Sequence, residues 1–266
     1  MSVTSTVEEN HRQKPSSSEK KAEKRRQRWV FWGRKWRRLD YFKLTASLFV
    51  HSMALLAPFY FTWSALWVTF LFYTIGGLGI TVSYHRNLAH RSFKVPKWLE
   101  YLLAYCALLA IQGDPIDWCG RRTNVEDLKK QWFYRFLQKT VMFHILGLGL
   151  ILFYLGGMSF VTWGMGVGAA LEVHVTCLIN SLCHIWGTRT WKTNDTSRNV
   201  WWLSVFSFGE SWHNNHHAFE SSARQGLEWW QIDISWYIVR SLEIVGLAYD
   251  VKLPTESQRR RMAIVR

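Results

Sequence analysis

Histidines that could bind a metal are clustered in this 266-residue chain rather than scattered along it. His85 and His90 lie five positions apart and directly follow a long apolar run. His213, His216 and His217 occupy positions i, i+3 and i+4, which fall within about one-third of the circumference of a helix. We therefore expect these three imidazoles to converge on one point. Neutral imidazole is the commonest metal ligand and suits iron, copper and zinc alike.

Two long uncharged runs must position these histidines. Residues 44–84 contain no Asp, Glu, Lys or Arg, and neither do residues 140–171. A helix that crosses hydrocarbon needs about 20 mostly apolar residues, so each run can supply a pair of spans. Pro58 with an aromatic patch, and Gly156 with Gly157, indicate the turn within each run. The sequence predicts two transmembrane hairpins, with spans at about 44–62, 65–82, 141–155 and 160–179.

A hairpin returns the chain to the face on which it started. His85 and His90 follow the second span, and His184 follows the fourth, with Asn180 four residues before it. All of the clustered histidines would then open on one side of the bilayer. The expected fold class is an all-α membrane protein with four transmembrane helices and a cytosolic, histidine-rich helical cap. Two very apolar soluble hairpins are the less favoured alternative.

The net charge of +14 is concentrated at the N-terminus. Residues 1–39 contain 12 Lys and Arg against four Glu, and aromatic residues follow the basic stretch. This pattern is typical of a cytoplasmic flank on an anionic membrane surface, which we favour over nucleic-acid binding. We expect residues 1–39 to form a basic, largely disordered cytosolic tail and residues 40–266 a single membrane domain. With no signal peptide, transit peptide or retention signal visible, the predicted location is the endoplasmic reticulum membrane, with both termini cytosolic.

The remaining segments give weaker signals. The four cysteines lack the spacing of a disulfide framework or a zinc site. Residues 98–112 are apolar but too short to cross a bilayer, which favours an interfacial segment. After a cap at Thr123 or Asn124, a helix is predicted to end near Lys139, and residues 229–247 show the pattern of an amphipathic helix. His51 and His144 lie within spans without a visible partner, so we expect packed neutral side chains. His174, beside Glu172, is expected to have a structural or ligand-supporting role.

Three motifs resemble the landmarks of the membrane fatty-acyl desaturases. They are HRNLAH (residues 85–90), NSLCH (residues 180–184) and GESWHNNHH (residues 209–217). The flanking segments DTSRN (195–199) and WWQID (229–233) also match. Together with GDPIDW (113–118), the chain most resembles the plant delta-9 acyl-lipid and acyl-CoA desaturases. The resemblance covers nearly the whole chain from about Trp36 onward.

The resemblance implies a pair of irons held almost wholly by histidines on the cytosolic face. Carried over motif by motif, the implied ligands are His85, His90, His184, His213, His216 and His217, with Asn180 holding a water. No catalytic residue beyond these ligands is implied. The reaction implied uses O2, with electrons from cytochrome b5 or a similar donor, to remove two hydrogens from neighbouring methylenes of an acyl-CoA or acyl-lipid. An unactivated C–H bond needs such a metal-generated oxidant.

The chain departs from this family after Trp118. The family has a second histidine box, of HxxHH type, soon after the segment that matches residues 113–118. Here Trp118 is followed at once by Cys119, and no histidine lies between His90 and His144. The simplest interpretation is that an internal segment is absent at 118/119, through alternative splicing or an error in the gene model. Each iron would then lack part of its ligand set.

Two functions of different classes therefore compete. The first is a fatty-acyl desaturase, expected to be of delta-9 type. The second is a catalytically inactive relative that acts as a partner or regulator of full-length desaturases, in a homo- or hetero-oligomer. The match at residues 209–217 disfavours a membrane hydroxylase of the same histidine chemistry. A metal transporter is disfavoured because it would need ionisable residues within the spans, where the sequence has few.

Overall fold

The computed structural model describes residue 36 and residues 38–120 and 125–264. The chain divides into two compact units, residues 1–46 and 47–266. In the first unit the structure describes Trp36 and the start of helix α2 (Arg38–Leu56). The predicted disordered tail and the predicted helix cap at Thr123 or Asn124 therefore lie almost entirely outside the described residues.

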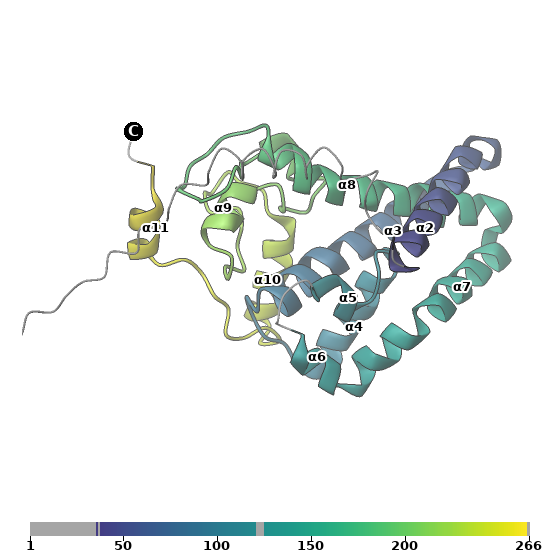
Figure 1. Ribbon diagram of the computed structural model, residues 1–266, viewed down its shortest axis with the longest axis horizontal. Helices are drawn as coiled ribbons and strands as arrows, with labels where there is room; N and C mark the ends of the chain where they lie inside the picture. Colours follow the sequence, from purple (N-terminus) through teal and green to yellow (C-terminus); the bar gives the residue numbers. More distant parts are fainter. Residues whose placement is uncertain (1–35, 37, 121–124, 265–266) are drawn as a thin grey trace, which may run out of the picture. The chain divides into compact units, whose positions relative to one another are not determined.

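The second unit is helical throughout its described residues, where β-pairing is limited to isolated bridges. After α2 come η1 (Ala57–Tyr60), α3 (Trp63–Leu78), η2 (Gly79–Ala89), α4 (Lys97–Leu108), α5 (Pro115–Cys119) and α6 (Glu126–Lys130). They are followed by α7 (Trp132–Phe160), η3 (Val161–Gly168), α8 (Ala169–Ser181), η4 (Leu182–His184), η5 (Trp201–Leu203), α9 (His213–Ala218), α10 (Ile234–Ile244) and α11 (Glu256–Met262). Figure 1 gives their arrangement. The predicted all-α class is confirmed for these residues.

The first predicted turn is present, but the helices around it have different limits. A short 3-10 helix containing Pro58 follows α2, and Thr62 then caps α3 by accepting a hydrogen bond from the backbone of Ala65 at 3.1 Å. Helix α3 continues without interruption into the π-helix η2. The continuous segment Trp63–Ala89 is long and apolar enough to cross a membrane, whereas Leu44–Tyr60 forms a shorter apolar helix.

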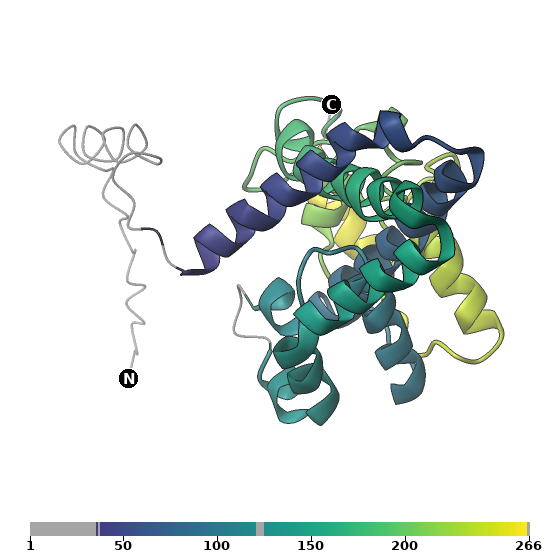
Figure 2. The same cartoon turned by 90° about the vertical axis from the view of Figure 1, so that its right-hand side faces the viewer.

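The second apolar run forms one long helical segment with a sharp kink. Gly156 (φ −155°, ψ 18°) and Gly157 (φ 62°, ψ −152°) break the helical conformation where the sequence predicts the turn. The two arms, α7 and η3–α8, diverge from this kink in Figures 1 and 2. The segment Trp132–His184 is the other candidate for membrane crossing among the described residues, by length and composition.

The predicted helix end near Lys139 is wrong. Helix α6 ends at Lys130, because Gln131 adopts an extended conformation, and α7 begins at the next residue. Helix α7 then continues through Lys139 into the apolar run. Residues 132–146 contain neither proline nor glycine, so nothing in the local sequence interrupts the helix at the point where its polarity changes.

Helix α4 packs closely against η2 and closes the core beneath the histidines. A Cβ atom on Gly79 would lie 2.2 Å from the backbone nitrogen of Ala107, so only glycine permits this approach. Tyr84 and Leu88 of η2 belong to the same buried cluster as Ala107 and Leu128. The first histidine motif is thus carried by a π-helix with a fully packed inner face.

The predicted amphipathic helix at residues 229–247 is shorter in the structure. Helix α10 begins at Ile234, because Asp233 accepts a hydrogen bond from the backbone of Trp236 at 2.9 Å and caps the helix. Beyond α10 the chain pairs with the loop that follows η2, where Lys94 and Tyr249 form an antiparallel bridge. This return fixes the loop that follows His90.

Candidate metal centre

The π-helical hydrogen bonding of η2 explains the five-residue spacing of its histidines. In an α-helix, positions i and i+5 point in different directions, since neighbours on one face are three or four residues apart. In a π-helix, hydrogen bonds join i and i+5, which therefore stack on successive turns. The backbone N–H of His90 donates to the carbonyl of His85 at 3.0 Å. Their ring centroids lie 4.7 Å apart.

His216 completes a first histidine cluster, defined as His85, His90 and His216. The His216 ring centroid lies 4.6 Å from that of His85 and 4.6 Å from that of His90. One ring nitrogen from each residue lies within 4.8 Å of the other two. These atoms come from η2 and α9, which are more than 120 residues apart in the sequence.

A second histidine cluster consists of His184, His213 and His217. The Nε2 atom of His213 lies 3.1 Å from Nε2 of His184 and 3.1 Å from Nε2 of His217. Here, too, three ring nitrogens lie within 4.8 Å of one another. The two clusters together contain the six histidines that the sequence singles out.

The third histidine motif divides between the clusters, which corrects the expectation that its three rings converge on one point. His213 and His217, four residues apart on α9, have ring centroids 4.3 Å apart and join the second cluster. His216 is rotated away from them by its position on the helix, with its centroid 6.0 Å from that of His213, and joins the first. Helix α9 is therefore shared by both clusters.

Two asparagines fasten α9 to the surrounding loops. The Asn214 side-chain oxygen accepts hydrogen bonds from the backbone nitrogens of Thr190 and Trp191, both at 2.8 Å. The Asn215 side chain donates to the Gln225 carbonyl at 2.7 Å and accepts from the Asn199 side chain at 2.7 Å. Such anchoring is needed because an isolated six-residue helix is not stable in water.

The environment of the rings favours the neutral imidazole that metal binding requires. Burial, together with the neighbouring His217 and His184, lowers the pKa of His213 to about 3. Burial and the rings of His85 and His90 also lower the pKa of His216. In addition, Nδ1 of His216 is buried without a hydrogen-bond partner. Neutral rings with unshared nitrogen lone pairs can hold two metal ions, one in each cluster.

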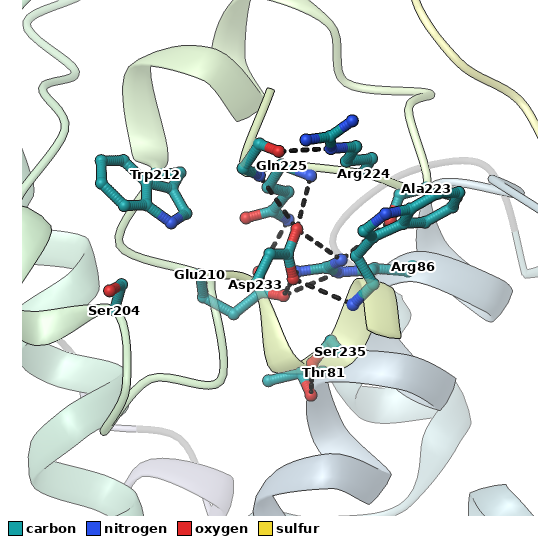
Figure 3. Close-up of polar contacts among 12 residues, drawn as sticks. Thr81, Arg86, Ser204, Glu210, Trp212, Ala223, Arg224, Gln225, Asp233 and Ser235 are labelled. Atoms are coloured by element: carbon teal, nitrogen blue, oxygen red, sulfur yellow. Dashed lines mark hydrogen bonds and ion pairs between the residues drawn. The ribbon is translucent and has the colours of Figure 1, made fainter. Parts of the chain in front are cut away.

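One carboxylate supports each cluster. Oε2 of Glu210 lies 2.5 Å from Nδ1 of His85, and Oδ2 of Asp195 lies 2.5 Å from Nδ1 of His217. Figure 3 shows that Glu210 is in turn held by the guanidinium of Arg86. Neither carboxylate is assigned a role by the sequence alone. The sequence feature that could have identified them is their position inside two desaturase-like motifs, at residues 195–199 and 209–217.

The other residues named from the sequence lie apart from the clusters or have local partners. The Asn180 side chain donates to the carbonyl of Thr176 within α8 at 2.8 Å, and its water-mediated role stays a prediction. The sequence shows no partner for His51, but in the structure its Nε2 lies 3.2 Å from Nε2 of His174. His144 likewise has a partner, the Thr140 hydroxyl at 3.0 Å.

The segment before the predicted gap packs directly beside the first cluster. Asp114 caps α5 by accepting hydrogen bonds from the backbones of Ile116 and Asp117. The Trp118 ring centroid lies 6.2 Å from that of His85, and Cys119 is buried in the core cluster that contains Tyr84. The junction 118/119 therefore lies at the end of a capped helix that borders the histidines.

Comparison with known proteins gives close relatives over the whole chain. Delta-9 acyl-lipid desaturase 2 of Arabidopsis thaliana is 76% identical over 307 residues, covering 100% of both chains. Delta-9 acyl-lipid desaturase 1 of the same plant is 64% identical over 307 residues, again covering 100% of both. A chloroplastic palmitoyl-monogalactosyldiacylglycerol delta-7 desaturase of that plant is 46% identical, covering 90% of this chain and 76% of its own length.

A family model described as fatty acid desaturase matches residues 120–249, a range that contains both His184 and the third histidine motif. The two delta-9 desaturases extend the likeness to the first motif, since their matches cover the full chain. The histidine geometry and these similarities agree: the chain belongs to the fatty acid desaturase family and is, by family, an oxidoreductase.

Proposed function

We propose that this chain is built as a delta-9 fatty-acyl desaturase whose two histidine clusters hold a pair of irons and which uses O2 to place a cis double bond in an acyl chain. The single observation that carries the proposal is the pairing of the clusters. Six imidazoles from three distant segments supply two sets of three ring nitrogens, each set within 4.8 Å.

The residues present fit iron. Imidazole is a suitable ligand for iron, and three ligands on each ion leave positions open for oxygen. His85, His90 and His216 would hold one ion, and His184, His213 and His217 the other. When bound, the irons supply the oxidising power needed to take hydrogen from an unactivated C–H bond. The chain's own part is to keep the rings neutral, to orient them, and to hold the Nδ1 protons of His85 and His217 on fixed acceptors.

We further propose that the helices form two transmembrane hairpins, with the clusters in a cap on the cytosolic side of the endoplasmic reticulum membrane. The kink at Gly156 and Gly157 supports the second hairpin. The positions of the ligands support the cap, since His85 and His90 lie at the end of η2 and His184 follows α8. A glycan on the sequon Asn194-Asp195-Thr196 would contradict this topology.

For substrate and partners, we propose an acyl chain carried on a lipid or on coenzyme A, and electrons from cytochrome b5 or a similar donor. The names of the two delta-9 acyl-lipid desaturases favour a lipid-bound chain. The delta-7 name of another relative means that family membership alone does not fix the double-bond position. The delta-9 assignment follows the higher identities of 76% and 64%.

We propose that a segment with the second histidine box is missing between Trp118 and Cys119, which leaves both irons short of ligands. The aligned length of 307 exceeds the chain's 266 residues by 41, which supports an internal gap. The family match begins at Gly120, directly after the junction. The same observation favours a second candidate function: an inactive relative that acts as a partner or regulator of full-length desaturases.

The test is expression in yeast that lacks its own desaturase, followed by fatty-acid analysis. We would compare the 266-residue chain with a chimera carrying the relative's segment at the 118/119 junction, and with the same chimera bearing His90→Ala. We expect monounsaturated product from the intact chimera only. Product from the 266-residue chain would refute the missing-ligand proposal and the inactive candidate. No product from an expressed chimera would refute the desaturase proposal.

If the chimera alone is active, co-expression decides between an inactive remnant and a regulator. The 266-residue chain would be added to cells that express the active chimera at a fixed level. A regulator changes product formation and is recovered with the chimera from detergent extracts. Unchanged product and no recovery would exclude the regulatory function.

A further inference from the structure

Each histidine cluster contains one ring whose outer nitrogen faces a carboxylate. In the first cluster this pair is His85 Nδ1 and Glu210 Oε2, 2.5 Å apart. In the second it is His217 Nδ1 and Asp195 Oδ2, also 2.5 Å apart. Neither carboxylate belongs to the three-residue groups whose atoms could hold an ion. The two clusters thus have the same outer support from unrelated parts of the chain.

An ionised carboxylate can only accept a hydrogen bond, so it decides which ring nitrogen carries the proton. Nδ1 of His85 and of His217 must be protonated to donate to these oxygens. The lone pair then lies on Nε2 in each ring. For His217 this atom points into the cluster, since it lies 3.1 Å from Nε2 of His213. The carboxylates therefore select the tautomer that can bind a metal through Nε2.

Glu210 is itself held in place by a buried network (Figure 3). Arg86 contacts Glu210 Oε1 through Nε at 3.0 Å and Nη2 at 2.9 Å, and Gln225 donates to Oε2 at 2.9 Å. Arg86 is shared with Asp233, at 3.1 Å and 2.9 Å. One guanidinium thus faces two buried carboxylates, which leaves one formal negative charge beside His85. This surplus negative charge favours binding of a metal cation by the His85 ring.

Asp195 is held by its own loop and touches the second cluster from outside. Its Oδ1 accepts from the backbone N–H of Ser197 at 2.9 Å, which leaves Oδ2 for His217. The adjacent Thr196 hydroxyl lies 3.2 Å from Nδ1 of His184. Two successive residues of one loop therefore contact two rings of the same cluster.

We propose that Glu210 and Asp195 are positioning residues that act separately, Glu210 on the first cluster and Asp195 on the second. The inference rests on the proposed two-ion centre and adds to it a division of labour. Replacing either carboxylate by its amide removes the obligatory acceptor and lets the ring present the wrong tautomer. Loss of such outer partners typically lowers metal affinity about 10–100-fold. The loss should fall on one cluster only.

The test is titration of the purified, metal-free full chain in detergent with Co²⁺, whose visible spectrum reports ligand geometry. His90→Ala disables the first cluster and His184→Ala the second, so each background isolates one site. Glu210→Gln and Asp195→Asn are then added to both backgrounds. Glu126→Gln, which removes the exposed partner of Lys129 within α6, is the matched control.

We expect Glu210→Gln to weaken Co²⁺ binding about 10–100-fold in the His184→Ala background and to leave the His90→Ala background unchanged. Asp195→Asn should give the opposite pattern, and Glu126→Gln no change in either. Equal weakening in both backgrounds, or none, would overturn the division of labour while the metal centre stands. If the unmutated chain binds no Co²⁺, the proposed centre itself fails, and this inference with it.

Discussion

His90 donates its backbone N–H to the carbonyl of His85 at 3.0 Å, and this five-residue step places both rings against His216. The spacing of the first motif is therefore a property of the π-helix. A histidine four residues after His85 would instead have the spacing of an α-helical pair.

Moving the second histidine of the first motif from position 90 to position 89 should not preserve metal binding. His90→Ala should remove one ligand of the first cluster and lower Co²⁺ stoichiometry in purified protein. Adding Ala89→His restores a histidine at i+4 from His85, the spacing suited to an α-helix. We expect no recovery of stoichiometry in the double variant. Recovery would mean that η2 adopts α-helical hydrogen bonding in solution.

Acid should destabilise the metal-free protein. Burial and nearby histidines lower the pKa of His213 from 6.5 to about 3. Burial opposes ionisation of Glu210, but the charges of His85 and Arg86 outweigh it and lower that pKa from 4.5 to about 2. As the pH falls below 6.5, and then below 4.5, the unfolded chain therefore takes up these protons before the folded chain does. Both groups thus contribute stability that is complete at neutral pH and declines in acid.

The measurement is the midpoint of thermal unfolding in detergent with a chelator, from pH 8 to pH 4. We expect a constant midpoint above about pH 7 and a fall below pH 6.5. His213→Asn should flatten the part of the curve between pH 6.5 and 4.5. A midpoint that is the same across the range would contradict the prediction.

Arg86→Lys should unfold the protein more easily, although the charge is kept. Arg86 is 1% exposed and spans two carboxylates, which a single ammonium cannot do with the same geometry. Leaving one buried charge unpaired typically costs about 3–5 kcal/mol. Arg91→Lys is the matched control, because its pair with Asp127 is largely exposed and contributes about 0–1 kcal/mol. Equal denaturation midpoints for the two variants would argue against a buried network.

Gly157→Ala should destabilise the kink near the C-terminal end of α7. The backbone at Gly157 (φ 62°, ψ −152°) lies in a region open essentially to glycine, and another residue there costs about 1–3 kcal/mol. Gly147→Ala is the control within the same helix, since a Cβ there meets nothing within 4 Å. Relative to glycine, alanine inside a helix stabilises by about 0.5–1 kcal/mol. Opposite shifts in the thermal midpoint are expected, and a shared direction would contradict the kinked conformation.

The sequence was sufficient for the features that depend on local composition. The run of uncharged residues predicted helices, the Gly156-Gly157 pair predicted the break, and motif spacing identified six histidines that the structure brings together. Each of these signals lies within a short window of the chain. Helix limits were less predictable. The sequence becomes apolar after Lys139, but its helical propensity does not drop there, so α7 continues through this residue.

Features that depend on distant residues could not be predicted in the same way. The contact between His51 and His174 joins positions 123 residues apart. The division of the third motif depends on where η2 and η4 present their rings to α9, which helical spacing alone does not determine. Glu210 and Asp195 become partners of specific rings only after the loops around α9 have folded. Three-dimensional packing decided these points.

Helix α9 should tolerate few substitutions. Within residues 213–217, every side chain either enters a histidine cluster or fastens the helix through Asn214 and Asn215. The two tasks together occupy all five of these positions, so none of them is free to vary. A library that varies each residue of the chain should therefore show its longest continuous stretch of intolerant positions here, even where the replacements keep size and polarity.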